Sequence, residues 1–600
     1  MGRILKITSI LCGVLLCLPY CARQSSTLTG GLRDTIPPVF LYAEPAMNST
    51  GFSARRIDIY FDEYVKLQNI NSTFIVSPPM SEKPEVVLYG KYIRIKLPED
   101  PVPGYTYTMS FGETIVDNNE NNKMGFFEYV FSTSDRIDSL TLTGRVLEAF
   151  TGNAPAQKEG TDIKVMLYND IRDSIPYLER PAYIARADAY GFFEFNHLRA
   201  DTFMLFVLED VGDDMLFGVP DERIAFMDTL VIIDDACLRS EAEADLFHTD
   251  SVRAKTPEMV PHRLDLYLFQ EEKSRQYRTS YNRPEPNRLV YTFNMPLDSL
   301  PGIALVDTVI EPAPFLPFLS AGRDTVTYWI LDTTLVTTPM LRVALTSPVT
   351  VDSLKMKVAR TDTLRMQAEA VQAPAATGRG RRRQENQVEA KRADEQLRLS
   401  SNADGGTLAL NGRFYLRVSQ PVSAVDMQRL HLFEVASDTV SRPVEFQFAQ
   451  DSADLLRYAV DWPLQEQKVY RFVADTMAFT SVYGVHNDST VIRVTVQSLD
   501  FYSNIQIALH NVQGHMLIQV FQQGRDKVFK QLEVDRNGVL NIAFLPPGQY
   551  TLKAVYDANA NGKWDTGNYL KGIQPEKVDV YEDPVTTQSS FTTEVDWTLK

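Results

Sequence analysis

From residue 35 onward, short runs rich in Val, Ile, Phe, Tyr and Thr alternate with turns of Gly, Pro, Asn and Asp. The runs RIDIYF (residues 56–61), YIRIKL (92–97) and YTYTMSF (105–111) each alternate apolar and polar residues. Such alternation places one face of a strand in a core and the other in water. Because the runs recur about every ten residues, we predict an all-β fold of tandem β-sandwiches.

An internal duplication indicates how the strands group. DAYGFFEFNHLRADTFMLFVLED (residues 188–210) aligns without a gap with DRNGVLNIAFLPPGQYTLKAVYD (535–557). Four pairs of residues keep the same offsets: Asp188 with Asp535, Gly191 with Gly538, Leu198 with Leu545, and Phe203 with Tyr550. Each copy is predicted to be a turn and two strands of one sandwich. A weaker match links RIDIYFDEYV, from residue 56, with RFYLRVSQPV, from residue 413.

The N-terminus, MGRILKITSILCGVLLCLPYC, has the features of a signal peptide. Arg3 and Lys6 precede an apolar run that is shorter than the ~20 residues of a membrane-spanning helix. Cys21 ends this run and precedes the polar string ARQSSTLTGG, so we predict that Cys21 carries a lipid. Tyr20 departs from the small residue that usually precedes such a cysteine, and the alternative is cleavage nearby and free secretion. Since Cys237 is the only cysteine after residue 21, disulfides are not the framework of the fold.

The charge balance restricts the partners of the protein. The net charge is −17 and the pI is near 5.0. Nucleic-acid binding needs concentrated Lys and Arg, so no nucleic-acid partner is expected. Broad adhesion to an anionic membrane surface is disfavoured for the same reason.

Residues 366–406 differ in composition from the rest of the chain. This segment has no aromatic residue and is dense in Ala, Arg, Gln and Glu, so it cannot bury enough apolar surface to fold alone. Helical periodicity is confined to residues 384–399. We predict a disordered or partly helical linker. Its RGRRR cluster (residues 379–383) is either a solvated part of that linker or a site for an anionic partner.

A search for catalytic patterns gives one weak pair. The seven histidines form no HExxH, and there is no GxSxG motif and no phosphate-binding glycine loop. Asp62 and Glu63 are the best acid–base candidates, but adjacent residues on a strand point to opposite faces. Cys237 follows Asp234 and Asp235, which disfavour its thiolate. We predict that the protein has no catalytic residues and is not an enzyme. A hydrolase that uses Asp62 and Glu63 is a less favoured alternative.

The segment YDANANGKWDTG (residues 556–567) resembles a calcium-binding loop. Asp557, Asn559, Asn561 and Asp565 place oxygens at alternate positions around Gly562. Position twelve, however, is Asn568 rather than an acid, and a strand pattern precedes the loop where a helix is expected. The first copy of the duplication, LEDVGDDMLFG, keeps the turn without these oxygens. Two interpretations stay open: a structural turn, or a weak Ca²⁺ site in the C-terminal copy alone. No other cofactor is predicted.

Further polar and aromatic residues have two interpretations each. VDNNENN (residues 116–122) either caps a turn or binds a metal. The aromatic candidates for glycan or protein binding, which are alternatively core residues, are Tyr277, Tyr281, Trp564 and Tyr569.

Several segments carry a resemblance to a known family. RDTIPPVF (33–40), IDIYFDEYVKL (57–67), IVSPPM (75–80), PGYTYTMSFGETIVDNNENN (103–122) and YVFSTSD (129–135) resemble the bacterial Ig-like domain that opens a group of Bacteroidota outer-membrane lipoproteins. LTGRVLEAFTGNAPAQ (142–157), together with DAYGFFEF, looks like the transthyretin-like or carboxypeptidase-regulatory-like sandwich of the same proteins. The last hundred residues, with NGKWDTGNYLKGIQPE (561–576), look like a second one.

The resemblance implies a non-catalytic protein. It suggests a scaffold or accessory subunit of an outer-membrane complex, such as β-barrel assembly or secretion machinery, with a β-barrel protein or other envelope lipoproteins as partners. The alternative is a surface adhesion or glycan-binding lipoprotein. The implied location is the outer membrane, through the lipid on Cys21, with the surface or periplasmic side left open.

The predicted division of the chain combines the resemblance with the duplication. In order, it is a lipoprotein signal peptide (1–21), a tether (22–35), an Ig-like domain (36–135), a transthyretin-like sandwich (138–250), a middle β domain (255–365), the Arg-rich linker (366–406), a second Ig-like domain (407–500) and a second transthyretin-like sandwich (501–600).

Overall fold

The computed structural model describes residues 35–156, 161–218, 221–248, 250–272, 275–351, 356–368, 396–403, 406–437 and 440–600. Strands dominate these residues and the helices are short, so the predicted all-β fold of tandem sandwiches is confirmed. The chain forms two compact units. Met1–Leu147 and Ala154–Leu268 make the first, and Glu148–Asn153 and Phe269–Lys600 make the second.

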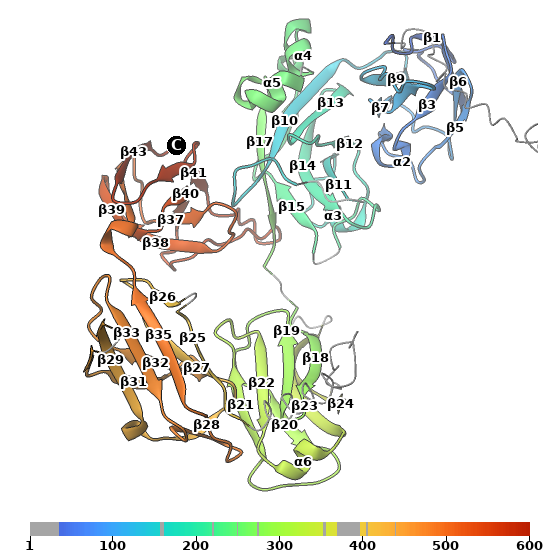
Figure 1. Ribbon diagram of the computed structural model, residues 1–600. Helices are drawn as coiled ribbons and strands as arrows, with labels where there is room; N and C mark the ends of the chain where they lie inside the picture. Colours follow the sequence, from blue (N-terminus) through green and yellow to red (C-terminus); the bar gives the residue numbers. More distant parts are fainter. Residues whose placement is uncertain are drawn as a thin grey trace, which may run out of the picture. The chain divides into compact units, whose positions relative to one another are not determined.

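The N-terminal sandwich, drawn in blue in Figure 1, is part of the first unit by its residue range. Its elements are β1 (Phe40–Glu44), β2 (Arg56–Phe61), β3 (Val65–Leu67), α2 (Ile70–Thr73), β4 (Ile75–Ser77), β5 (Glu85–Tyr89), β6 (Tyr92–Lys96), β7 (Thr106–Gly112), β8 (Ile115–Asp117) and β9 (Phe127–Ser132). One sheet has the order β1-β2-β6-β5 and the other β4-β7-β9, while β3 pairs with β8. Ile57 and Ile59 of β2 lie in one core with Met109 of β7, as the alternation predicts.

The second part of the first unit is a sandwich of eight strands. Its elements are β10 (Leu140–Glu148), β11 (Asp162–Tyr168), α3 (Ile175–Leu178), β12 (Tyr183–Arg186), β13 (Phe192–Leu198), β14 (Asp201–Asp210), β15 (Arg223–Phe226), β16 (Val231–Ile233), η1 (Asp235–Cys237), α4 (Glu241–Phe247), α5 (Asp250–Lys255), η2 (Pro257–Met259) and β17 (Leu264–Gln270). The sheet order is β12-β11-β14-β15-β17-β10-β13, and β16 pairs with β14. A capping box formed by Ser240 and Glu243 begins α4.

The second unit begins with a middle β domain. Its elements are β18 (Arg278–Glu285), β19 (Arg288–Phe293), β20 (Gly302–Leu305), β21 (Phe315–Leu319), β22 (Thr325–Ile330), α6 (Thr333–Thr337), β23 (Met340–Val351) and β24 (Met356–Gln367). They form the sheets β18-β19-β22-β21 and β20-β23-β24 around one core.

Another two-sheet domain follows in the second unit. Its elements are β25 (Leu399–Ser401), β26 (Thr407–Leu408), β27 (Phe414–Val418), β28 (Val422–Val425), η4 (Met427–Arg429), β29 (Leu430–Ser437), β30 (Val440–Pro443), β31 (Gln447–Asp451), β32 (Asp454–Asp461), β33 (Val469–Ala474), β34 (Phe479–Ser481) and β35 (Thr490–Val496). The sheets are β25-β27-β32-β31 and β26-β35-β33-β29-β30, and β28 pairs with β34.

The last sandwich repeats the topology of the eight-stranded sandwich in the first unit. Its elements are η5 (Leu499–Phe501), β36 (Ser503–His510), β37 (Met516–Gln522), β38 (Val528–Val534), β39 (Gly538–Leu545), β40 (Gly548–Tyr556), β41 (Val578–Val580), β42 (Val585–Thr587) and β43 (Thr592–Thr598). The neighbours β39-β36-β43 and β38-β37-β40-β41 correspond to β13-β10-β17 and β12-β11-β14-β15, and β42 on β40 corresponds to β16 on β14. The duplication therefore extends beyond the aligned segments.

Two domain boundaries lie elsewhere than the sequence placed them. The sandwich predicted to end at residue 250 includes β17, which lies beside β10 in the same sheet. The sequence did not predict that the chain returns to this sheet, because the polar helices α4 and α5 precede β17 and their sequence gives no strand signal. The predicted linker at 366–406 is also shorter: β24 runs to Gln367, and β25 pairs with β27. Leu399, which ended the predicted helical segment, thus begins a strand, and residues 369–395 lie outside the described residues.

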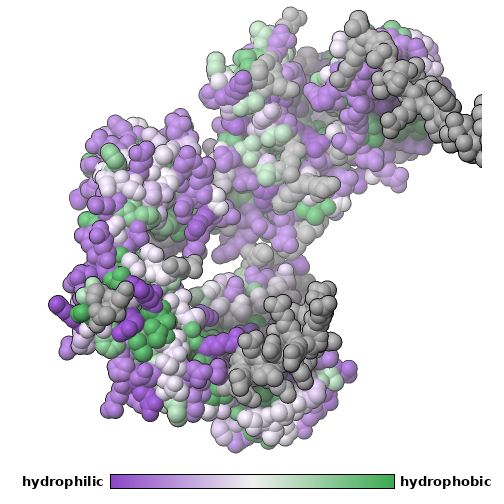
Figure 2. Space-filling view, in the orientation of Figure 1, coloured by the Kyte–Doolittle hydropathy of each residue, from purple (hydrophilic) through white to green (hydrophobic). Residues whose placement is uncertain are grey.

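The surface of the protein is consistent with sheets that each have one buried face and one solvated face. Figure 2 shows that hydrophilic residues cover most of the visible face, with hydrophobic residues gathered in smaller patches. Within the described ranges, none of the helices has the length and apolar character that crossing a bilayer requires.

Candidate functional site

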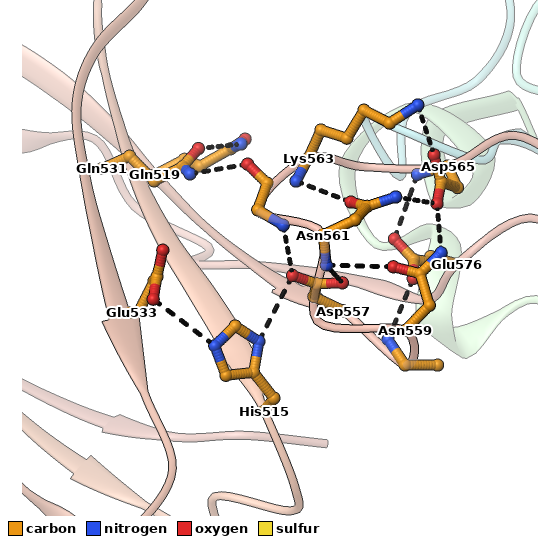
Figure 3. Close-up of polar contacts among 12 residues, drawn as sticks. His515, Gln519, Gln531, Glu533, Asp557, Asn559, Asn561, Lys563, Asp565 and Glu576 are labelled. Atoms are coloured by element: carbon orange, nitrogen blue, oxygen red, sulfur yellow. Dashed lines mark hydrogen bonds and ion pairs between the residues drawn. The ribbon is translucent and has the colours of Figure 1, made fainter.

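The C-terminal loop begins at Asp557, directly after β40, and Figure 3 shows its polar contacts. Asp557 is fully buried, and its carboxylate accepts hydrogen bonds from the backbone N–H groups of Asn561 at 3.1 Å and Gly562 at 2.9 Å. His515 Nδ1 lies 3.2 Å from the same carboxylate. A buried carboxylate needs such partners, because desolvating its charge is costly without them. Asp557 therefore holds the loop closed.

The other three predicted calcium ligands pair among themselves. The side-chain oxygen of Asn559 accepts a hydrogen bond from the N–H of Asn561, and that of Asn561 accepts one from the N–H of Lys563, as in Asx-turns. Both side-chain amides donate to Asp565, at 2.5 and 2.6 Å, and Lys563 Nζ lies 3.0 Å from its other oxygen. Burial opposes the ionisation of Asp565, but the hydrogen bonds from Asn559, Lys563 and Asn561 outweigh it and lower its pKa.

Glu576 closes the loop from the far end and was missed by sequence reasoning. Its carboxylate accepts hydrogen bonds from the N–H groups of Ala558 at 2.9 Å and Asp565 at 3.0 Å. Trp564 donates its indole N–H to the carbonyl oxygen of Glu576 at 2.9 Å. Burial raises the pKa of Glu576. The acid that the calcium pattern lacks at position twelve is thus replaced by a more distant one that binds backbone N–H groups.

The first copy of the duplication builds the same turn. Asp210 is buried and accepts hydrogen bonds from the N–H groups of Asp214 at 3.3 Å and Met215 at 2.9 Å, four and five residues later, as Asp557 does. The third and fifth residues after the aspartate have positive φ in both copies: Asp213 and Met215 in the first, Ala560 and Gly562 in the second. Met215 shows that the bend accepts a side chain where the second copy has glycine.

A third buried aspartate holds the Asn-rich turn of the N-terminal sandwich. One oxygen of Asp117 accepts hydrogen bonds from the N–H groups of Asn119, Glu120 and Asn121, and the other from Asn122 at 2.7 Å. Burial opposes its ionisation, yet these backbone bonds lower its pKa. Of the two interpretations of VDNNENN, this geometry matches the turn cap.

The donor set of the C-terminal loop fits calcium poorly. The amide oxygens of Asn559 and Asn561 are held by backbone N–H groups, and their amide nitrogens point toward Asp565. Calcium takes six to eight oxygen ligands. In the part of the chain that the structure describes, no three His, Cys, Asp or Glu side chains are grouped to hold a metal ion. Calcium binding at this loop stays a prediction.

The calcium prediction has a direct test. We expect any calcium to bind with a Kd of roughly 10⁻⁴ to 10⁻³ M and to stabilise the last sandwich by no more than about 1 kcal/mol at a few times Kd. The readout is thermal unfolding followed by the fluorescence of Trp564 and Trp597 during a calcium titration. Asp557→Ala should abolish the response, whereas Asp535→Ala, at an exposed position of the same sandwich, should leave it intact. An unmoved midpoint in millimolar calcium would assign the loop to a structural turn.

Two other predicted elements lie outside the described residues: Cys21 and the RGRRR cluster at 379–383. Asp62 and Glu63 lie in the turn between β2 and β3. Asp62 is exposed and accepts a hydrogen bond from the N–H of Val39 at 2.7 Å, so it links this turn to the residue before β1. Cys237 is buried in the core of the eight-stranded sandwich of the first unit, where Arg263 donates a hydrogen bond to its sulfur at 3.2 Å.

The four aromatic candidates separate into two kinds. Tyr569 is buried and Trp564 is half-buried, so both act in packing. Tyr277 and Tyr281 are exposed, and Arg278 lies over the ring of Tyr281.

A stacked row of tyrosines on the N-terminal sandwich was not foreseen. Tyr42, Tyr60, Tyr92 and Tyr89 stack across four neighbouring strands with ring centroids 4.5 to 5.1 Å apart. The alternation predicted outward positions for them but not their stacking, which depends on strand register.

Sequence reasoning also missed a pair of acids in the first unit. Glu128 of β9 and Glu194 of β13 both line a cavity. Glu194 forms ion pairs with Arg239 and with His248 Nε2, the latter at 3.2 Å. Burial opposes the ionisation of Glu194, but the interactions with His248 and Arg239 lower its pKa. Burial and the neighbouring Glu194 raise the pKa of Glu128 to about 7. No local motif signals this pair, since its members come from different domains of the unit.

A buried lysine lies in the last sandwich. Lys553 of β40 donates a hydrogen bond to the carbonyl oxygen of Phe150 at 3.1 Å and lies over the rings of Phe150 and Phe521, at 4.0 and 4.8 Å from their centroids. Burial lowers its pKa to about 8. The aromatic rings partly replace the hydration that the ammonium loses.

Comparison with known proteins identifies one domain. A family model described as a bacterial Ig-like domain matches residues 34–133. No curated protein matches the sequence.

Matches among solved structures have low similarity. They include the N-terminal part of the bacterial S-layer protein SbsC, at 11% identity over 34% of this chain and 45% of that chain, with a TM-score of 0.13. The present chain thus spans less than half of that fragment. They also include the major pilin subunit BcpA of Bacillus cereus, at 8% identity over 77% and 99% of the two chains, with a TM-score of 0.13. A fragment of alpha-2-macroglobulin from Escherichia coli matches at 12% identity over 51% and 96%, with a TM-score of 0.17. By the family match, the N-terminal sandwich of this chain is a bacterial Ig-like domain.

Proposed function

We propose that this protein is a non-catalytic, lipid-anchored protein of the bacterial envelope that acts as a scaffold or accessory subunit of an outer-membrane complex, such as β-barrel assembly or secretion machinery. The observation that carries the proposal is the use of the buried aspartates. Asp117, Asp210 and Asp557 each bind backbone N–H groups of their own turns. Acids used in this way stabilise rigid sandwiches and have no free role in proton transfer.

The domain organisation supports the same proposal. A bacterial Ig-like domain followed by further sandwiches provides spacing and broad sheet surfaces for protein contacts. We propose that the two eight-stranded sandwiches are transthyretin-like or carboxypeptidase-regulatory-like modules, which their shared strand order supports.

The anchor and the partner are tested together. Cys21→Ala should abolish acyl labelling and move the protein out of the membrane fraction. Affinity purification from detergent-solubilised membranes should recover a β-barrel protein or another envelope lipoprotein in stoichiometric amount. Unchanged fractionation and labelling of the Cys21→Ala protein would contradict the anchor, and a partner-free monomer would contradict the scaffold role.

The adhesion alternative has one specific feature in its favour. Tyr42 and Tyr89, at two ends of the stacked row, are nearly half exposed on the outer face of the Ig-like domain. Each of these two rings stacks on one neighbour, Tyr42 on Tyr60 and Tyr89 on Tyr92. Recovery of a bound glycan on a monomeric protein would favour adhesion over the scaffold. Turnover of a substrate that Glu63→Gln abolishes would favour the hydrolase.

A further inference from the structure

A cavity of about 620 Å³ lies within the first unit, where the outer face of the Ig-like sheet β4-β7-β9 meets β12 and β13. Its volume is in the range of roughly 300–1,000 Å³ that is typical of small-ligand sites. The N–H of Ile184 on β12 donates to the Ser77 hydroxyl on β4 at 3.0 Å, which fixes the two walls against each other. Thr108 and Ser110 of β7 line the cavity, while Met109 between them faces the Ig-like core.

An insertion between two strands completes the cavity. In the eight-stranded sandwich of the first unit, η1, α4, α5 and η2 connect β16 to β17, and Phe247 and His248 at the end of α4 line the cavity. In the last sandwich, the corresponding strands β42 and β43 are joined by residues 588–591 alone. The cavity is thus a feature of the first copy and not of the shared fold.

The charges that line the cavity are paired, with one exception. Arg186 pairs with Asp162 at 2.8 Å, Arg253 pairs with Asp188 at 2.8 Å, and Glu113 pairs with Lys123 at 2.6 Å. Glu194 has Arg239 and His248.

The exception is Glu128. It accepts side-chain hydrogen bonds from the Asn196 amide, at 3.3 Å, and from Ser110, and the nearby His248 favours its charge, but no lysine, arginine or histidine of the described residues forms an ion pair with it. A half-buried carboxylate beside a second carboxylate then holds its charge poorly, which is why its pKa is raised.

A second polar group of the cavity lining has no hydrogen-bond partner among the described residues. Thr108 is only 7% exposed, and its hydroxyl has no hydrogen-bond partner within the described residues. A buried hydroxyl in this state is destabilising unless a ligand supplies the missing bond. Three aromatic side chains complete the lining: Phe126, Phe192 and Phe247. Aromatic faces attract organic cations and cover hydrocarbon.

We propose that this cavity binds an organic ammonium group on a hydrocarbon stem, with Glu128 as its counter-ion and the Thr108 hydroxyl as a hydrogen-bond acceptor. The ammonium replaces the proton that Glu128 otherwise holds, and the aromatic rings cover the stem. An anionic ligand would find the cavity's arginines already paired. The same chemistry is present in a free aliphatic amine and in a lysine side chain of a partner polypeptide. The site goes beyond the scaffold role and does not depend on it.

The test measures hexylammonium binding to the purified full chain by isothermal titration calorimetry. Binding is expected at about pH 8 and should be about tenfold weaker at about pH 6, because below its pKa Glu128 must first release a proton. Glu128→Gln should weaken binding by roughly tenfold or more. Glu113→Gln is the matched control: it also lines the cavity, but its side chain is 47% exposed and paired with Lys123, and its binding should match the wild type.

A second variant and further ligands complete the test. Thr108→Val keeps the shape of the side chain, breaks no existing hydrogen bond, and should weaken binding several-fold. Hexanol and hexanoate should not bind. A further ligand is an acetylated and amidated tripeptide with a central lysine. If the natural ligand is a lysine side chain of a partner polypeptide, this tripeptide should bind as well as hexylammonium. If the natural ligand is a free amine, the tripeptide should bind much more weakly. The proposal is overturned by an absence of hexylammonium binding at about pH 8, by equal binding of hexanol, or by wild-type affinity in Glu128→Gln.

Discussion

Replacing Gly191 with alanine is expected to destabilise the eight-stranded sandwich of the first unit by roughly 3 kcal/mol or more. Gly191 has φ +84°, where an L side chain is strained, and a Cβ atom there would lie 2.2 Å from the carbonyl oxygen of Val146. The surroundings cannot yield easily, because the N–H of Val146 donates to the carbonyl oxygen of Gly191 at 2.8 Å. The alanine would therefore have to break the contact between this turn and β10.

Gly538, the aligned residue of the second copy, is the matched control. It has no positive φ, and a Cβ atom there would meet nothing within 4 Å. Gly538→Ala should change stability by less than about 1 kcal/mol, and in the favourable direction, since alanine restricts the unfolded chain.

The two glycine variants need separate readouts. All four tryptophans lie outside the first unit, at 329, 462, 564 and 597, so tryptophan fluorescence in urea should be unchanged by Gly191→Ala. Hydrogen exchange of peptides from β10 and β13 should instead show the loss. Equal costs at the two glycines would contradict the structural distinction between the copies.

Asp210→Ala is expected to cost about 3–5 kcal/mol in the same sandwich. The Asp210 side chain is fully buried and pairs at 2.7 Å with Lys164, whose side chain is only 6% exposed. Burial opposes the charge of Lys164, but the hydrogen bonds that its ammonium donates to Asp210 and Asp213 outweigh the effect of burial and raise its pKa. Removing Asp210 leaves a buried ammonium with one exposed partner and leaves the N–H of Met215 without its acceptor.

Two further variants separate the causes of this loss. Asp213 shares the same lysine but is 69% exposed, so Asp213→Ala should cost less than about 1 kcal/mol. Adding Lys164→Met to Asp210→Ala should recover most of the stability, because no unpaired charge then remains buried. Hydrogen exchange in β11 and β14 measures all three. If Asp210→Ala cost no more stability than Asp213→Ala, or if adding Lys164→Met recovered none of the loss, the explanation by a buried ion pair would be wrong.

Much of the fold was predictable because its signals are local. RIDIYF became β2 with Ile57 and Ile59 inside, since side chains alternate between the faces of a strand whatever the strand packs against. The boundary near residue 250 was not predictable. Whether β17 joins the preceding sheet depends on pairing with β10, more than a hundred residues earlier, and no local pattern records that pairing.

The candidate functional residues also divide into those that the sequence indicated and those that only the structure brought together. Asp557 and its glycine marked a tight turn in the sequence, and the structure has that turn, because Asx hydrogen bonds span only a few residues. Glu128, Glu194 and His248 carried no signal. They come from β9, from β13 and from the end of α4, and only the packing of two domains brings them to one cavity.

The aligned aspartates of the duplication show where the limit lies. The sequence by itself determined that Asp188 and Asp535 each lie at a turn between strands, since the Asp and Gly spacing acts within a few residues. Only the tertiary structure decided their surroundings. Asp188 pairs with Arg253, which the inserted helices supply, while the side chain of Asp535 is 80% exposed. Burial and ion pairing depend on what distant segments place nearby, and identical residues in duplicated turns therefore acquire different roles.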